Sequence, residues 1–211
     1  DPIGDLSDLA EERGLHLHVD AAFGGFVLPF LSGPVPPFDF QLPGVSSITV
    51  DPHKMGLSVQ PAGGLLFRDA ALAVPVQVDV PYLAGGATSH ATITGTRTGA
   101  AVLATWALMR HLGRSGYREV VERCMDLTAD LVAAVEQVEG VEVVMSPTMN
   151  IVGIRPTEGG VEGLSASLRS SGWAIGQFAT HVRVVLLPHV KGGHLERFVA
   201  DLKAGVAVAV S

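Results

Sequence analysis

The residues best suited to chemistry lie in one stretch, where a β-branched run ends at Asp51-Pro52 and is followed by His53-Lys54. Lys54 is one of three lysines in the chain, and it follows an apolar strand in a loop punctuated by proline and glycine. A lysine amine in such a loop can carry a cofactor through a Schiff base. The alternative interpretation is an ordinary surface turn. The pattern makes Lys54 a candidate cofactor lysine.

Pyridoxal phosphate is the cofactor that such a lysine would carry, and it makes four demands on a protein. It needs the amine, an acidic partner for its pyridine nitrogen, a small residue against its ring, and donors for its phosphate. Asp20 ends an earlier strand and Ala22 lies two residues beyond it, while His53 and the loop containing Thr96 are candidates near the phosphate. A structural turn is the alternative for that Gly- and Thr-rich loop. Candidates exist for each of these needs except a complete set of hydrogen-bond donors around the phosphate.

The elements that must position these residues form an α/β pattern in the first half of the chain. A helix is predicted over residues 4–13 and a strand over 15–19, which halts at Asp20. After a proline-rich excursion, strands follow over 48–50 and 64–67, on either side of the loop with Lys54. Residues 70–98 are predicted to be loop-rich. Strand, long crossover and strand indicate an α/β sheet, and ligands bind at the carboxyl ends of such strands.

The second half has a different order of elements. Apolar spacing predicts one helix from residue 100 that stops at Gly113 and a longer one that ends at Gly140. Strands over 141–145 and 150–154, a helix over 160–171, a strand over 182–187 and a helix over 193–204 follow. This β-β-α-β-α order predicts a small α+β domain. We therefore expect one domain over residues 1–113, and a linking helix with the small domain over 114–211.

Composition excludes several classes of partner. Fourteen basic against 21 acidic residues give a net charge of −7 without a block of like charge, which argues against nucleic acid. Mean hydropathy is +0.38, yet no apolar run reaches the roughly 18 residues of a membrane span. Cys124 is the sole cysteine, which is typical of a reducing cytoplasm, and no His/Cys set has metal-ligand spacing. The start at Asp1-Pro2, without Met or a first strand, suggests a missing upstream segment.

Several segments together resemble one known family. They are His18-Val19-Asp20-Ala21-Ala22-Phe23-Gly24-Gly25-Phe26, Ser47 to Gly56 with its Asp-Pro-His-Lys core, Gly95-Thr96-Arg97-Thr98-Gly99, His181 to His189, and Gly193 to Phe198. The set is similar to the group II pyridoxal-phosphate-dependent amino-acid decarboxylases, and in particular to the archaeal-type tyrosine/aspartate decarboxylases. The resemblance covers essentially the whole chain.

The resemblance implies a fold and roles for individual residues. The fold would be α/β, of the fold type I class of pyridoxal-phosphate enzymes, with part of a large domain built on a mainly parallel sheet, a C-terminal α+β small domain, and a homodimer with active sites at its interface. Lys54 would carry the cofactor, Asp20 would pair with the pyridine nitrogen and Ala22 would face the ring. Tyr82 would be the general acid, unless it is a surface aromatic. Arg183 would hold the substrate α-carboxylate, unless it is a strand-edge charge.

The implied reaction is decarboxylation of an L-amino acid, of the tyrosine, aspartate or glutamate class, to its amine and CO₂. One alternative is a carbon–carbon aldehyde lyase of the sphingosine-phosphate lyase type, whose loop is similar to Asp20 to Phe26. A second alternative is a truncated, non-catalytic remnant or scaffold chain. Members of the family carry an upstream stretch with a ring-stacking residue and a phosphate-binding turn, and neither is found in this sequence. A cytoplasmic location is expected, with no membrane or nucleic-acid partner.

Overall fold

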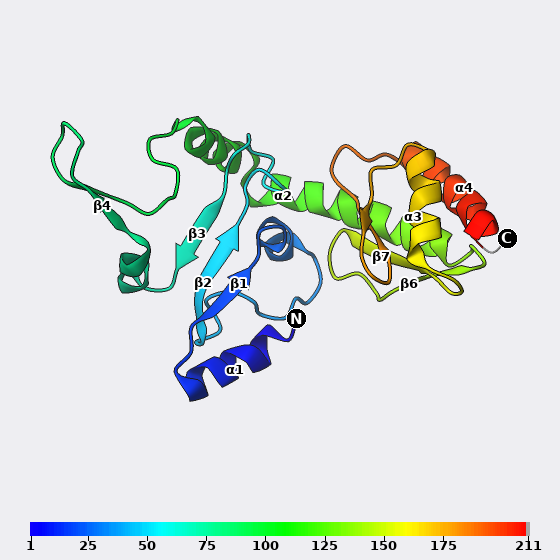
Figure 1. Ribbon diagram of the computed structural model, residues 1–211, viewed down its shortest axis with the longest axis horizontal. Helices are drawn as coiled ribbons and strands as arrows, with labels where there is room; N and C mark the ends of the chain where they lie inside the picture. The colour runs from blue at the N-terminus through cyan, green and yellow to red at the C-terminus, as the bar shows by residue number, and fades with distance from the viewer. Residues whose placement is uncertain (210–211) are drawn as a thin grey trace. The chain divides into compact units, whose positions relative to one another are not determined.

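The computed structural model describes residues 1–209, which fold into two compact units (Figure 1). The first unit is Asp1–Tyr117 and the second begins at Arg118. Among the described residues, no helix combines the length and the apolar character that a membrane crossing requires. The observed α/β architecture confirms the predicted fold class.

The first unit is built on a three-stranded sheet in the order β1-β2-β3. Its elements are α1 (Ile3–Arg13), β1 (Leu17–Asp20), β2 (Val45–Val50) and β3 (Gly64–Phe67). β1 pairs in parallel with β2, and β3 is antiparallel to β2. Gly14 ends α1 in the left-handed conformation at φ 60°, which a residue without Cβ adopts at no steric cost. Alternation then buries Val19 and Ile48 on one face and leaves Asp20 on the other.

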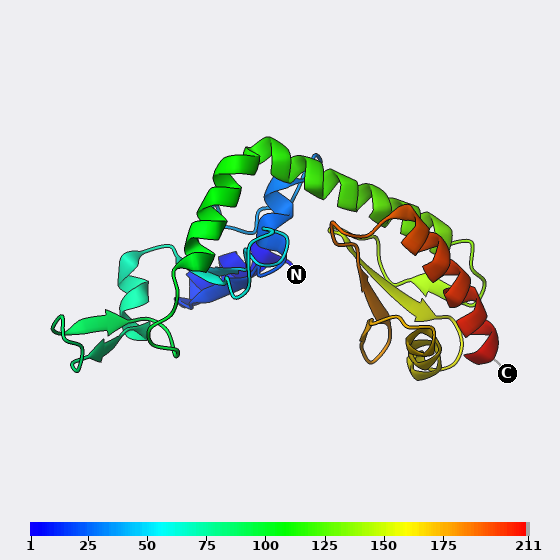
Figure 2. The same ribbon diagram turned by 90° about the horizontal axis from the view of Figure 1, so that it is seen from above.

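The segment between β3 and the next helix contains more regular structure than the sequence predicts. A 3₁₀ turn over Ala70–Val76 leads into β4 (Val78–Val80), which pairs antiparallel with β5 (Thr88–His90). Figure 2 shows these two strands side by side. Each strand has only three residues, and no side chain of either is fully buried. Strands this short and exposed leave no hydrophobic alternation, so the sequence predicted only loop.

Helix α2 (Ala100–Val135) is two helical segments joined at Gly113. Gly113 has φ 58° and ψ −169°, values that are not helical and that only glycine adopts readily. The predicted helix stop at this residue is confirmed. The first segment and Tyr117 belong to the first unit, and the rest of α2 begins the second unit.

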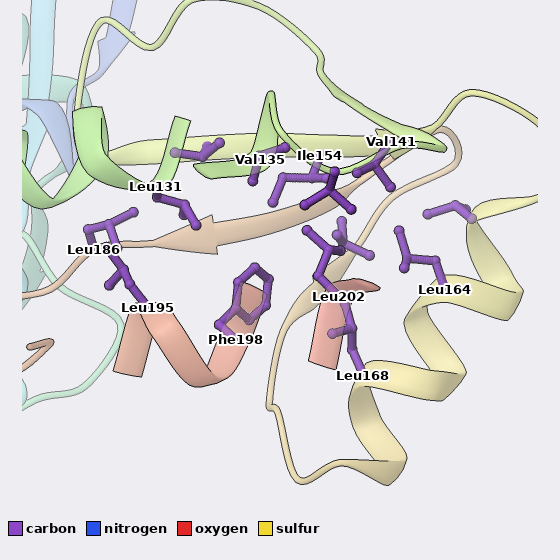
Figure 3. Close-up of a cluster of buried hydrophobic side chains, with 14 residues drawn as sticks. Leu131, Val135, Val141, Ile154, Leu164, Leu168, Leu186, Leu195, Phe198 and Leu202 are labelled. Carbon is purple, nitrogen blue, oxygen red and sulfur yellow. The ribbon is translucent and has the colours of Figure 1, made fainter. Parts of the chain in front are cut away.

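The second unit has the predicted α+β composition. A four-stranded antiparallel sheet has the order β6-β7-β9-β8, and α3 and α4 pack against each other. The elements are β6 (Val141–Val143), β7 (Ile151–Pro156), α3 (Val161–Ser170), β8 (Gly176–Gln177), β9 (Val182–Val185) and α4 (Gly192–Ala209). Figure 3 shows the core side chains pointing toward one another from α2, α3, α4 and the sheet; they include Leu131, Ile154, Leu164, Phe198 and Leu202. The two-residue strand β8 was not predicted.

Candidate active site

The ends of β1 and β2 bring two of the predicted site segments together. Because the strands are parallel, their carboxyl ends lie at the same edge of the sheet, and Asp20 is in register with Thr49. Beyond the strands, the Asp51 N–H donates a hydrogen bond to the Ala22 carbonyl oxygen at 3.1 Å. The segment that carries Asp20 and Ala22 is thus bonded directly to the loop that carries Lys54.

The Asp20 carboxylate is oriented by its own loop. Its Oδ1 accepts a hydrogen bond from the Ala22 N–H at 3.0 Å, a local turn that aspartate forms readily. The loop then packs closely against the end of β2, since a Cβ on Gly25 would lie 2.6 Å from Val50 Cγ1. A side chain at position 25 would therefore force Val50 to shift, so a glycine fits this close approach. Asp20 itself is exposed.

The loop after β2 ties the His53 and Lys54 side chains to neighbouring residues. The His53 Nδ1 atom lies 2.6 Å from the Ala62 carbonyl oxygen, which ties the ring to the next loop. The Lys54 amine forms an ion pair with Asp51, with 2.8 Å between Nζ and Oδ2. Asp51 was noticed only as part of the motif, and no role had been predicted for it. The spacing of three residues in a turn was the only signal for the pair.

Two residues of α2, one on each side of Gly113, hydrogen-bond to the loop. The Tyr117 hydroxyl donates to the Gly56 carbonyl oxygen at 3.0 Å, and the Ser58 and Thr105 hydroxyl oxygens lie 2.9 Å apart. Met55 is fully buried. Burial raises the pKa of the Tyr117 hydroxyl, so it keeps its proton and remains a donor. Sequence reasoning assigned Tyr117 no role in the site, because a partner 61 residues away leaves no local pattern.

Replacing Tyr117 with phenylalanine is expected to lower the free energy of unfolding by about 1–2 kcal/mol, because the buried Gly56 carbonyl loses its donor while the ring remains. Tyr82 is the other tyrosine, and its side chain is 80% exposed. Tyr82→Phe is therefore the matched control, with an expected change within about 0.5 kcal/mol. Urea denaturation of both variants measures the difference. Equal stability of the two variants would show that the Tyr117 hydroxyl does not hold the Lys54 loop.

A second network lies beneath Asp20 on the same face of the sheet. The His18 ring bonds Ser47 Oγ through Nδ1 at 2.8 Å and Thr49 Oγ1 through Nε2 at 3.0 Å. The ring therefore links the strand that ends in Asp20 to the strand that leads to Lys54. The alternation of β1 places His18 on the same face as Asp20.

Tyr82 and Thr96 lie outside this cluster. Tyr82 is in the turn between β4 and β5, and Thr96 is exposed in the segment that leads to α2. Within the described part of the chain, no hydrogen bond, ion pair or ring contact joins either side chain to Asp20 or Lys54. The structure thus brings together Asp20, Ala22, His53 and Lys54, and it does not bring Tyr82 and Thr96 to them.

Arg183 belongs to the second unit, on β9. Its guanidinium carbon lies 5.0 Å from the centre of the Phe178 ring, which is a cation–π contact. The side chain lines a cavity of about 510 Å³, whose other walls include Trp173, Leu186 and His194. A guanidinium at the wall of a largely apolar cavity can bind a carboxylate through two parallel hydrogen bonds.

Comparison with known proteins shows the family to which the chain is similar. Residues 1–156 match the pyridoxal-dependent decarboxylase conserved domain. The chain is 47% identical over 206 residues to an L-aspartate decarboxylase of Thermococcus kodakarensis, covering 96% of this chain and 53% of the relative. It is 43% identical over 208 residues to a probable L-tyrosine/L-aspartate decarboxylase of Methanothermobacter thermautotrophicus, covering 96% and 56%. The chain spans about half the length of the curated relatives that it matches.

Solved structures of similar fold include enzymes of two reaction types. A sphingosine-1-phosphate lyase of Burkholderia pseudomallei is similar with a TM-score of 0.88 and 33% identity, covering 99% of this chain and 49% of that chain. A glutamate decarboxylase of Lactobacillus brevis is similar with a TM-score of 0.82 and 24% identity, covering 99% and 52%. The second likeness is one of fold alone.

Proposed function

Because the chain belongs to the pyridoxal-dependent decarboxylase family, we propose that the protein removes the α-carboxylate of an L-amino acid with pyridoxal 5′-phosphate, releasing the amine and CO₂. One observation carries the proposal. Asp20 ends β1 and Lys54 follows the adjacent parallel strand β2, and the hydrogen bond from Asp51 to Ala22 joins the loops beyond them. An acid and an amine at one sheet edge are the pair that this cofactor requires.

The residues present fit the cofactor by their chemistry. Lys54 supplies a primary amine on a half-exposed side chain, and Asp20 supplies an exposed carboxylate fixed by its turn. Ala22 offers a small surface beside that carboxylate, and His53 adds an imidazole held against Ala62. We assign Lys54 and Asp20 to cofactor binding and catalysis, with Ala22 and His53 as further cofactor contacts. Thr96 lies outside the cluster, so its assignment as a cofactor contact requires its exposed segment to move or a neighbouring chain to receive it.

Each residue has a separate task in the proposed reaction. When bound, the cofactor supplies an aldehyde for amine capture and a pyridine ring that accepts the electron pair left by CO₂. Lys54 donates the amine, and the negative charge of Asp20 favours a proton on the neighbouring ring nitrogen. Arg183 pairs with the substrate carboxylate, and Tyr82 returns a proton to the α-carbon. Tyr82 lies on an exposed turn, so this role requires the turn to move or a neighbouring chain to receive it.

The names of the relatives support an aspartate or tyrosine substrate. The two relatives described above are named for L-aspartate and for L-tyrosine and L-aspartate. We propose a substrate of this class, with glutamate as the next candidate because another relative, from Pyrococcus horikoshii, is named an L-aspartate/L-glutamate decarboxylase. We further propose a cytoplasmic homodimer as the working form.

Product analysis separates this function from its closest competitor. The competitor is a carbon–carbon aldehyde lyase, which the likeness to the Burkholderia lyase at 33% identity supports. Full-length protein with added cofactor should release CO₂ and the matching amine from L-aspartate or L-tyrosine. It should release no fatty aldehyde from a phosphorylated sphingoid base. Aldehyde release without CO₂ would select the lyase, and a colourless protein that releases neither product would leave a non-catalytic chain.

A further inference from the structure

The ion pair between Lys54 and Asp51 is the feature of the site that the proposed reaction does not use. The Nζ and Oδ2 atoms are 2.8 Å apart, and the Lys54 N–H also donates to the Asp51 carbonyl oxygen at 3.0 Å. The two residues therefore form one turn, closed by the backbone and by the side chains. An amine in such a pair is an ammonium ion, and an ammonium ion has no lone pair with which to attack an aldehyde.

Asp51 is the fixed partner of this pair and Lys54 the movable one. The Asp51 side chain is 17% exposed, against 39% for Lys54. The Asp51 N–H is bonded to Ala22, and a Cβ on Gly63 would lie only 3.2 Å from Asp51 Oδ1, so the carboxylate is packed against the next loop. A lysine side chain has four rotatable bonds and one charged end. When the pair opens, Lys54 is the residue that moves.

We propose that Asp51 is a positioning residue that holds the Lys54 amine at the sheet edge as an ammonium ion, and that the amine becomes available to an aldehyde only when this pair opens and the ammonium ion releases a proton to solvent. The catalytic meaning of this assignment rests on the proposed function. The pair itself does not, because it is a contact between two side chains of this chain. Asp51 is thus distinct from Asp20, whose carboxylate is bonded to Ala22 and not to the lysine.

Reductive methylation tests the pair without any cofactor. The lysine lone pair attacks formaldehyde, water leaves, and cyanoborohydride supplies the hydride that reduces the imine while solvent supplies the proton. The other two lysines, Lys191 and Lys203, are exposed and serve as references within the same molecule. Peptide mass spectrometry gives the methylation rate of Lys54 relative to these two. The variant is Asp51→Asn, and Asp8→Asn, which removes the same charge at an exposed helix position, is the control.

At pH 7 and low salt, Asp51→Asn should raise the relative rate of Lys54 about two- to fivefold, the range expected for a partly exposed ion pair. Asp8→Asn should leave the ratio unchanged. In 8 M urea the wild-type and Asp51→Asn ratios should become equal, because the pair requires the folded loop. Wild-type protein provides a test without mutation. Because salt screens the ion pair, 1 M NaCl should also raise the methylation rate of Lys54 relative to the two reference lysines. An unchanged ratio both in the variant and in high salt would overturn the proposal.

This outcome is independent of the proposed function. A protein that binds no pyridoxal phosphate can still show faster methylation of Lys54 in the Asp51→Asn variant. That result would support the ion pair between Asp51 and Lys54 but would give it no role in catalysis. A protein that binds the cofactor but shows no shift would retain the proposed function and lose Asp51 as the residue that positions Lys54. The two failures therefore give different patterns in the two measurements.

Discussion

Replacing Lys54 with alanine is expected to abolish the covalent link to pyridoxal phosphate and to lower turnover by about a thousandfold or more. The reason is that the amine of Lys54 follows β2 at the sheet edge where Asp20 ends β1, and the hydrogen bond from Asp51 to Ala22 joins the two loops. Treatment of the wild-type protein with cofactor and borohydride should place a reduced adduct on the peptide that contains Lys54. The alanine variant should show no adduct on that peptide.

The matched control for this experiment is Lys203→Ala. Lys203 is an exposed lysine on α4, in the second unit, and its removal should change neither the adduct nor the release of CO₂. The comparison separates specific capture at Lys54 from random reaction of lysines with an aldehyde. An adduct on Lys191 or Lys203 in place of Lys54, or undiminished CO₂ release from Lys54→Ala, would show that the cofactor lysine has been wrongly assigned.

Much of the site was predictable because it depends on features that repeat along the sequence. The strands that end at Asp20 and before Lys54 are short apolar runs with a long crossover, which predicts parallel neighbours. Parallel neighbours place their carboxyl ends at one edge, so the proximity of the two loops follows from strand direction. The helix stops at Gly14 and Gly113 were predictable for a similar reason, because both glycines adopt backbone angles that other residues avoid.

The contacts that sequence reasoning missed depend on residues far apart in the chain or on side-chain rotamers. Tyr117 bonds to Gly56 across 61 residues, and no spacing rule connects a helix tyrosine to a loop carbonyl. The ion pair of Lys54 with Asp51 is local, but it depends on the side-chain rotamers of the turn. The β4–β5 hairpin is too short and too exposed to leave a hydrophobic pattern. Each of these features depends on tertiary packing, which a local sequence pattern does not specify.

Asp20→Asn is expected to bind the cofactor normally and to lose turnover by about a hundredfold or more. The substitution changes charge and little else, because the amide oxygen of asparagine can accept the Ala22 N–H bond that Oδ1 accepts now at 3.0 Å. The loop, and the hydrogen bond between Ala22 and Asp51 that connects it to the Lys54 loop, should therefore persist. What is lost is the negative charge beside the pyridine nitrogen, and without it the ring accepts an electron pair less readily.

A matched control is available because Asp69 forms the same type of turn, with its Oδ1 accepting the Ala71 N–H at 2.8 Å. Asp69→Asn removes the same negative charge from the same type of turn, but at a position outside the cluster that contains Lys54. It should leave CO₂ release unchanged. Borohydride trapping should give the same adduct stoichiometry in wild type, Asp20→Asn and Asp69→Asn. Asp20→Ala should lose both turnover and part of the adduct, since alanine also removes the turn bond. If Asp20→Asn kept full turnover, the acid that serves the ring would have to be another carboxylate, and Asp51 is the nearest candidate to Lys54.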